Sequence, residues 1–194
     1  MARDLPLMPL AERRDDERYQ RLMAATRRAA RQGYESVSMR ELAQSTHMSM
    51  TTVYQYCSSK DHLIAEAHLE WMERFSHSLP SHPPRGRTAQ ARVLKYVGDV
   101  ISAWQENELL MMTLQRALYS LDAGVSEVRA SLHQNFVEIM DVMIGDDDVP
   151  NRVSALEIVG HVLDSVTYRW IAGTVDIGEA RRILERTVRT VIPK

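Results

Sequence analysis

The chain has 194 residues, of which 44% are hydrophobic and 26% are charged, values that are ordinary for a globular protein. Its net charge of −2 does not by itself indicate a nucleic-acid partner. The single cysteine, Cys57, excludes an internal disulfide and a cysteine-rich zinc site. The N-terminal residues lack a signal-peptide pattern and no apolar run approaches the ~20 residues of a membrane span, so we expect a cytoplasmic protein with no membrane partner.

Few glycines and prolines, together with almost no strand-like alternation, predict an all-α chain. Residues 1–14 are expected to form a flexible N-terminal arm and residues 15–62 a helix-turn-helix domain. Its first helix is predicted from residue 15 or 16 to Gly33, a second over 39–46 after the cap Ser38, and a third over 51–56. These three helices form the helix-turn-helix layout of DNA-binding proteins.

Residues 63–194 are predicted to form a second helical body. A fourth helix over 60–79, capped by Ser58 or Ser59, leads to a proline-rich break at 80–88. Further helices are predicted over 88–106, 107–121, 125–144, 151–173 and 177–191.

The third helix carries the side chains that point to DNA. Val53 and Cys57, four residues apart, are predicted to face the small core, whereas Thr52, Gln55 and Tyr56 are predicted to face outward. Hydroxyls and phenols donate to phosphate oxygens, and glutamine can read adenine. Lys60 begins the fourth helix, where backbone N–H groups already favour a phosphate.

Charge is distributed unevenly along the chain. Residues 1–62 hold ten Lys/Arg and eight Asp/Glu, whereas the remainder holds 14 and 18. Eight arginines fall between Arg13 and Arg40, a strip that suits phosphate contact, although a solvated helix face would explain it as well.

On the fourth helix His62, Glu66 and Glu70 share one face. That face is expected to be solvated, because ligands strung along one helix do not converge on one metal ion.

Residues 18–66 resemble the DNA-binding domain of the TetR family of bacterial transcriptional regulators. The likeness is carried by Gly33-Tyr34, by Ser38-Met-Arg40-Glu-Leu42-Ala43 and by Thr52-Val53-Tyr54-Gln55-Tyr56 with the following Ser59-Lys60-Asp61-His62-Leu63. It implies a dimeric repressor that binds double-stranded operator DNA and is released by a small effector. The DNA-contacting residues that it implies, together with the outward face, are Ser38, Arg40, Ser49, Met50, Thr51, Thr52, Tyr54, Gln55, Tyr56 and Lys60. Thr51 and Cys57 depart from the small residue and the phenylalanine that the family often has there.

The second body is rich in methionine and aromatic residues, which form adaptable walls for a ligand when they are not simply core. The predicted effector-binding residues are Trp71, Phe75, Trp104, Met111, Met112, Gln115, Tyr119, His133, Phe136, Met140 and Tyr168. The last two helices are apolar over more than one face, and in the family they pack against a second copy. The predicted homodimer interface comprises Leu156, Gly160, Leu163, Trp170, Leu184, Val188 and Val191.

Within the family, residues 107–144 are similar to the KstR group of steroid-catabolism repressors. That similarity implies a small hydrophobic effector that is lipid-, steroid- or acyl-CoA-like. Two other classes of function stay open from the sequence. A helical adaptor could bind protein through the outward Tyr/Thr face, but the arginine strip argues against it. An enzyme is disfavoured because the chain has no phosphate-cradling loop, nucleophile elbow or clustered metal ligands, and no cofactor is expected.

Overall fold

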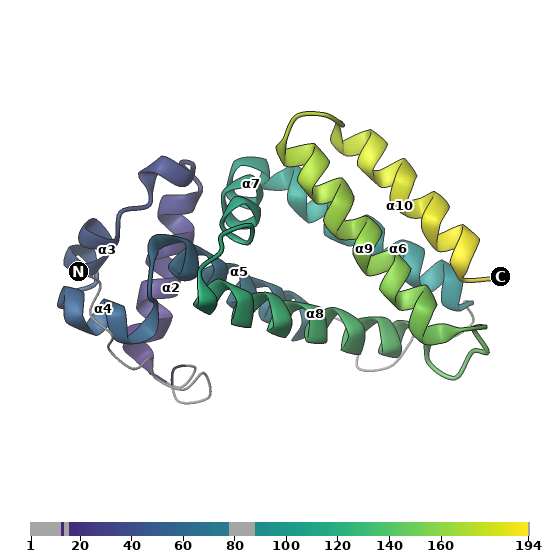
Figure 1. Cartoon of the computed structure of the whole chain (residues 1–194), viewed down its shortest axis with the longest axis horizontal. Coiled ribbons are helices and arrows are strands. Elements are labelled where there is room, and N and C mark those ends of the chain that lie inside the picture. The colour runs from purple at the N-terminus through teal and green to yellow at the C-terminus, as the bar shows by residue number, and fades with distance from the viewer. Residues whose placement is uncertain (1–12, 14–15, 78–87, 194) are drawn as a thin grey trace. The chain divides into compact units, whose positions relative to one another are not determined.

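The computed structural model of the chain describes residues 13, 16–77 and 88–193, and the side chains of residues 75–77 lie outside this description. Apart from Arg13 and Thr88, the predicted arm at 1–14 and the predicted break at 80–88 therefore lie outside the described residues. Every regular element within the described ranges is a helix, which confirms the predicted all-α fold (Figure 1). In the same ranges, no helix is both long and apolar enough to cross a membrane.

The chain divides into two compact units. Unit 1 comprises the residues up to Met72 together with Glu108–Ser131, and unit 2 comprises Glu73–Asn107 together with the residues from Leu132 onward. Residues 108–131, which the sequence assigned to the second body, thus belong with the N-terminal helices.

Unit 1 contains the predicted helix-turn-helix. It is built from α2 (Glu17–Ala30), the 3-10 turn η1 (Tyr34–Ser36), α3 (Met39–Ser45), α4 (Met50–Tyr56), most of α5 (Lys60–His77), α7 (Glu108–Ala117) and the start of α8 (Ala123–Ile144). Local sequence sets several helix starts. The Ser38 hydroxyl accepts a hydrogen bond from the Glu41 amide at 3.4 Å, and the Ser59 hydroxyl accepts one from the His62 amide at 3.1 Å. The predicted caps at the starts of α3 and α5 are thereby confirmed.

The polar face of α5 is buried, so the prediction that it is solvated is wrong. The exposed fractions of His62, Glu66 and Glu70 are 1%, 2% and 7%. Arg13 pairs with Glu66, and Arg27 pairs with Glu70. Buried carboxylates persist when they are paired and hydrogen-bonded, and both cations come from chain segments far from α5 in the sequence.

Unit 2 is a helical layer in which α10 (Ile177–Val191) packs against both α9 (Arg152–Ile171) and α6 (Ala89–Glu106) (Figure 1). The indole rings of Trp104 and Trp170 stack with centroids 5.8 Å apart and planes 2° apart. The buried Arg92 guanidinium donates to the Ile144 carbonyl at 2.6 Å and so satisfies a carbonyl at the C-terminal end of α8.

Candidate nucleic-acid interface

Helix α4 begins with a well-formed cap. The Ser49 hydroxyl accepts from the Thr52 amide at 3.0 Å and lies 2.9 Å from the Thr52 hydroxyl. The turn before it is closed by the Met48 amide, which donates to the Ala43 carbonyl at 2.8 Å, and by His47 at a positive φ of 58°. The start of α4 is therefore fixed to α3 by local bonds, so the orientation of its side chains is set by the turn.

The buried and the exposed side chains of α4 lie on different faces of the helix, as the sequence predicts for most positions. Val53 and Cys57 are completely buried. Thr51, Tyr54 and Gln55 are exposed. Met50 and Thr52 are half-buried, and Ser49 and Arg40 are exposed beside them. The outward surface thus offers hydroxyl, amide and phenol groups, which are donors suited to phosphate oxygens and base edges.

The structure places Tyr56 differently from its predicted outward position. Its side chain is only 1% exposed, because Tyr56 lies three residues after Val53 and shares its inward face. The ring meets that of Tyr19 edge-on at 5.6 Å, and the hydroxyl donates to the Asp16 carboxylate at 2.5 Å. Tyr56 therefore anchors α4 to the start of α2 and does not face outward, so its prediction as a DNA-facing residue is wrong.

Cys57 is completely buried at the end of α4. Burial raises the pKa of its thiol well above the usual value, and the nearby Glu66 carboxylate adds to the rise. The thiol is therefore protonated and shielded from solvent, which is the state of an inert structural cysteine.

Lys60 is held in place by an aromatic residue. Its Nζ atom lies 4.0 Å from the centre of the Tyr34 ring, and the Arg116 guanidinium lies 4.0 Å from the same ring centre. The Tyr34 hydroxyl donates to the Asp61 carboxylate, which fixes the ring. Burial raises the pKa of Tyr34 to about 12, with a further rise from Asp61. The Gly33-Tyr34 pair was visible in the sequence, but the role of Arg116 was not, because it lies on α7.

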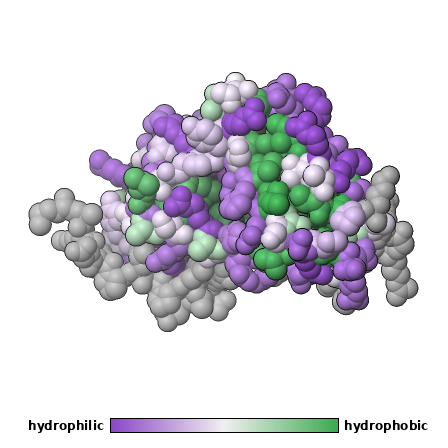
Figure 2. All heavy atoms as spheres, turned by 45° about the vertical axis from the view of Figure 1, so that its right-hand side comes forward, coloured by the Kyte–Doolittle hydropathy of each residue, from purple (hydrophilic) through white to green (hydrophobic). Residues whose placement is uncertain are grey.

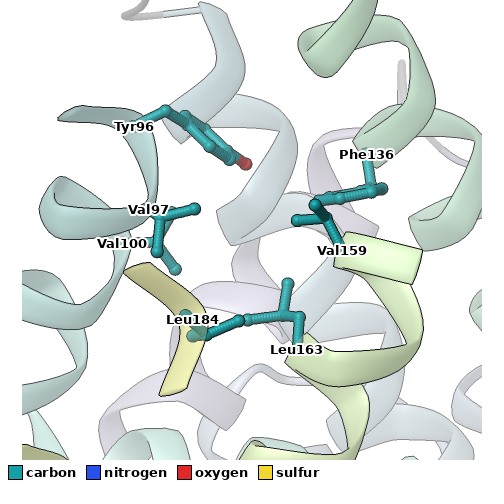
Figure 3. A pocket seen from close by; sticks show the side chains of 7 residues that line it. All are labelled: Tyr96, Val97, Val100, Phe136, Val159, Leu163 and Leu184. Atoms are coloured by element: carbon teal, nitrogen blue, oxygen red, sulfur yellow. The ribbon is translucent and has the colours of Figure 1, made fainter. Parts of the chain in front are cut away.

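An apolar pocket lies within unit 2. It is lined by Tyr96, Val97 and Val100 of α6, Phe136 of α8, Val159 and Leu163 of α9, and Leu184 of α10 (Figure 3). Figure 3 shows the seven side chains around one space, with the Tyr96 hydroxyl as the single polar group among them. Such a lining suits an apolar ligand.

The predicted effector-binding residues are divided between the two units. Phe136 lines the pocket. Trp104 stacks on Trp170, Met140 is buried, and His133 and Tyr168 are exposed. Trp71, Met111, Met112, Gln115 and Tyr119 belong to unit 1, and the Phe75 side chain lies outside the described residues. Apart from Tyr96, the pocket residues that were not predicted as effector-binding are aliphatic, and no chemical signal in the sequence separates a pocket wall from a core.

The predicted dimer residues lie mostly on the inner side of unit 2. Leu156, Trp170, Leu184 and Val188 are buried against the chain's own helices, and Leu163 lines the pocket. Gly160 faces the Phe136 ring, and Val191 is half-buried. The large apolar side chains left exposed on α9 are Val153, Ile158 and Tyr168. Figure 2, which brings the side of α9 and α10 forward, shows hydrophobic residues at the surface with hydrophilic residues around them.

The short helices α3 and α4, joined by a four-residue turn, define the chain as a helix-turn-helix protein. Residues 22–67 match the family described as bacterial regulatory proteins, tetR family, and residues 86–191 match the tetracyclin repressor-like C-terminal domain. The chain belongs to the tetR family of bacterial regulatory proteins, which confirms the predicted resemblance.

Similar proteins are known at the level of sequence and of fold. The chain is 26% identical over 188 residues to the HTH-type transcriptional repressor KstR of Rhodococcus jostii, covering 94% of this chain and 86% of that protein. It is 26% identical over 181 residues to the KstR repressor of Mycolicibacterium smegmatis, covering 91% and 87%.

Two solved structures share the fold. A TetR transcriptional regulator from Rhodococcus sp. RHA1 has a TM-score of 0.78 at 18% identity, over 90% of this chain and 94% of that chain. The regulator FadR from Bacillus subtilis, in complex with stearoyl-CoA, has a TM-score of 0.61 at 16% identity, over 88% and 97%.

Proposed function

We propose that the protein is a cytoplasmic, homodimeric transcriptional repressor that binds operator DNA through α4 and is released by a small hydrophobic effector. The observation that carries the proposal is the outward face of α4, where Thr51, Tyr54 and Gln55 are exposed beside Lys60, which is held over the Tyr34 ring. Three roles follow: Thr and Tyr hydroxyls donate to phosphates, Gln55 reads a base edge, and Lys60 neutralises a phosphate. In this proposal residues 15–62 bind DNA and residues 63–194 bind the effector and the second subunit.

Dimerisation is supported by α9. Val153, Ile158 and Tyr168 are 71%, 44% and 56% exposed, which leaves apolar surface on a helix whose other face is already packed. A two-fold dimer would carry two copies of α4 and would match a two-fold operator with half-sites about one helical turn, ~34 Å, apart.

The class of effector is supported by the pocket of unit 2. Six of its seven lining side chains are hydrocarbon, and Tyr96 alone adds a hydroxyl. That chemistry favours a long acyl chain or a steroid nucleus over a charged metabolite. The open space in the pocket is only about 10 Å³, so the lining side chains must move apart to admit either ligand. The KstR relatives are named as repressors, and the FadR structure holds stearoyl-CoA, which agrees with this choice.

Helix α8 runs without a break from unit 1, which contains α4, into unit 2, which contains the pocket. It carries Phe136, which lines the pocket of unit 2, and Gly124, which lies against His62 in unit 1. A ligand that displaces Phe136 pushes on a helix whose first turn lies against His62 of α5, the helix that begins with Lys60. The proposed release of operator DNA uses this connection.

The test is a fluorescence-anisotropy titration of the duplex upstream of the protein's own gene, with a scrambled duplex in parallel. We expect tight binding to the first duplex, and Lys60→Ala should weaken it while lowering the salt slope by about one. The control is Lys95→Ala, because Lys95 is an exposed lysine of unit 2 that forms an ion pair with Asp99. Stearoyl-CoA and a sterol-derived ketone are then added to the complex. Equal affinity of wild-type protein for both duplexes, or no release by either compound class, would contradict the corresponding half of the proposal.

A further inference from the structure

The arginines of the strip between Arg13 and Arg40 do not share one role. Arg13 is buried against Glu66, and Arg27 pairs with Glu70. Arg18 is engaged by Asp16 through both a hydrogen bond and an ion pair. Three positive charges of the strip are thus neutralised within the protein and are not available to a partner.

Two other arginines of α2 differ from these three. Arg21 and Arg28 are exposed and make no ion pair with any residue that the structure describes. They lie seven residues apart and so project from the same face of the helix, with Ala24 between them.

These side chains line a groove between α2 and the turn of the helix-turn-helix. Its walls are Arg21, Ala24 and Arg28 on one side and Ser45, Thr46 and His47 on the other. None of these six residues is acidic, so the lining carries the positive charges of two arginines and no negative charge. The small side chain of Ala24 leaves the space between the arginines open.

The groove adjoins the DNA-facing end of α4. His47 is three residues before Met50, with which α4 begins. When a recognition helix enters the major groove by its N-terminal residues, the sugar-phosphate backbone that borders the groove passes beside the preceding turn. A cleft with two free guanidinium groups at that place suits a phosphate, because guanidinium binds phosphate oxygens in bidentate fashion.

We propose that the groove formed by Arg21, Arg28 and the turn at His47 binds a backbone phosphate of the operator, next to the stretch that α4 reads. The inference rests on the proposed DNA binding and extends it to a second surface, on α2. It assigns Arg21 and Arg28 a role in affinity rather than in sequence preference, because phosphate contacts are the same on every sequence.

The test is the salt dependence of operator binding by Arg21→Gln, Arg28→Gln and the double variant. Each single change should lower the slope of log affinity against log salt by about one and the double change by about two, with operator and scrambled duplexes weakened alike. Ala24→Leu, which fills the groove and keeps both charges, should also weaken binding to both duplexes.

The matched control is Arg31→Gln. Arg31 is exposed and unpaired among the described residues and follows α2, but it does not line the groove. The salt slope of Arg31→Gln should equal that of the wild type, and circular dichroism should show that all five variants are folded. If Lys60→Ala lowers the slope and the groove variants do not, the groove inference fails while the proposed function stands. A slope lowered equally by Arg31→Gln would also overturn it, and a wild-type protein that binds no DNA would overturn both.

Discussion

Arg13 and Glu66 form an ion pair with 2.7 Å between Nη1 and Oε1, and their side chains are only 5% and 2% exposed. The same Arg13 nitrogen donates to the Tyr56 carbonyl at the end of α4, at 2.8 Å. The Tyr19 hydroxyl donates to the second Glu66 oxygen at 2.7 Å, and His62 Nε2 lies 3.2 Å from the first. One buried carboxylate therefore joins α2, α5 and the end of the proposed recognition helix.

Loss of the Glu66 charge should destabilise the protein strongly. Glu66→Gln leaves the buried Arg13 without its counter-charge, and such a change costs about 3–5 kcal/mol in free energy of unfolding. The control is Asp141→Asn, because the Arg152–Asp141 pair is 31% and 64% exposed and should contribute less than about 1 kcal/mol. Urea denaturation of both variants measures the difference. Equal losses of free energy of unfolding in the two variants would show that the buried ion pair stabilises the protein no more than the exposed one.

The hydroxyl of Tyr56 should contribute to the free energy of unfolding, and the hydroxyl of Tyr54 should contribute to the affinity for operator DNA. The hydrogen bond from Tyr56 lowers the pKa of Asp16 to about 2; burial opposes this, and Arg18 adds to the lowering. Tyr56→Phe should therefore reduce the free energy of unfolding by about 1 kcal/mol at neutral pH. Tyr54→Phe should leave stability unchanged and weaken operator binding.

The pH dependence follows from the sign of that shift. The folded pKa of Asp16 lies below its ordinary value of 3.8. The ionised carboxylate therefore stabilises the folded state fully above pH 3.8, and this stabilisation is lost as the pH falls from 3.8 toward about 2. The stability gap between wild type and Tyr56→Phe should narrow across this window in urea titrations. A gap that stays constant down to pH 2.5 would count against the Tyr56–Asp16 bond.

Gly124 should not tolerate a side chain. A Cβ atom at Gly124 would overlap the His62 ring, whose Nδ1 accepts from the Ser58 amide at 3.1 Å. Gly124→Ala should therefore cost about 1–3 kcal/mol, as overpacking does. Gly98→Ala is the control, because its Cβ would lie 3.6 Å from Arg181 in ordinary contact, and alanine favours the interior of α6 by up to about 1 kcal/mol. Thermal unfolding should shift in opposite directions for the two variants.

The pocket of unit 2 should be separable from DNA binding. Leu163→Phe adds bulk to the pocket wall and should raise the effector concentration needed to release operator DNA, with operator affinity unchanged. Leu121→Phe makes the same substitution at a position that is 97% exposed and should leave effector release as in the wild type. Identical release curves for Leu163→Phe and wild type would place the effector elsewhere.

Local features could be predicted from the sequence, and features that depend on distant partners could not. Ser38 and Ser59 act within three residues, so their capping roles were visible. Tyr56 sits in a pattern that equally suits an outward face, and its inward position is fixed by Asp16, 40 residues away. His62 and Glu66 look like a solvated edge until Arg13 and Tyr19 are brought against them by the fold.

The same limit applies to the second body. Apolar periodicity predicted α9 and α10 correctly as helices, but a helix that is apolar on two sides does not reveal which side faces its own chain. Leu184 and Val188 therefore looked like dimer contacts, whereas the structure buries them inside unit 2 and leaves Val153 and Ile158 exposed.

The central claim is that the outward face of α4 reads operator sequence while Lys60 holds the backbone. It is tested most directly by the ratio of affinities for operator and scrambled duplexes, measured by anisotropy for wild type, Gln55→Ala and Lys60→Ala. We predict that Gln55→Ala lowers this ratio, by about 1–3 kcal/mol if the contact is bidentate, and that Lys60→Ala weakens both duplexes with the ratio unchanged. A ratio that Gln55→Ala leaves at the wild-type value would contradict the assignment of Gln55 to base reading.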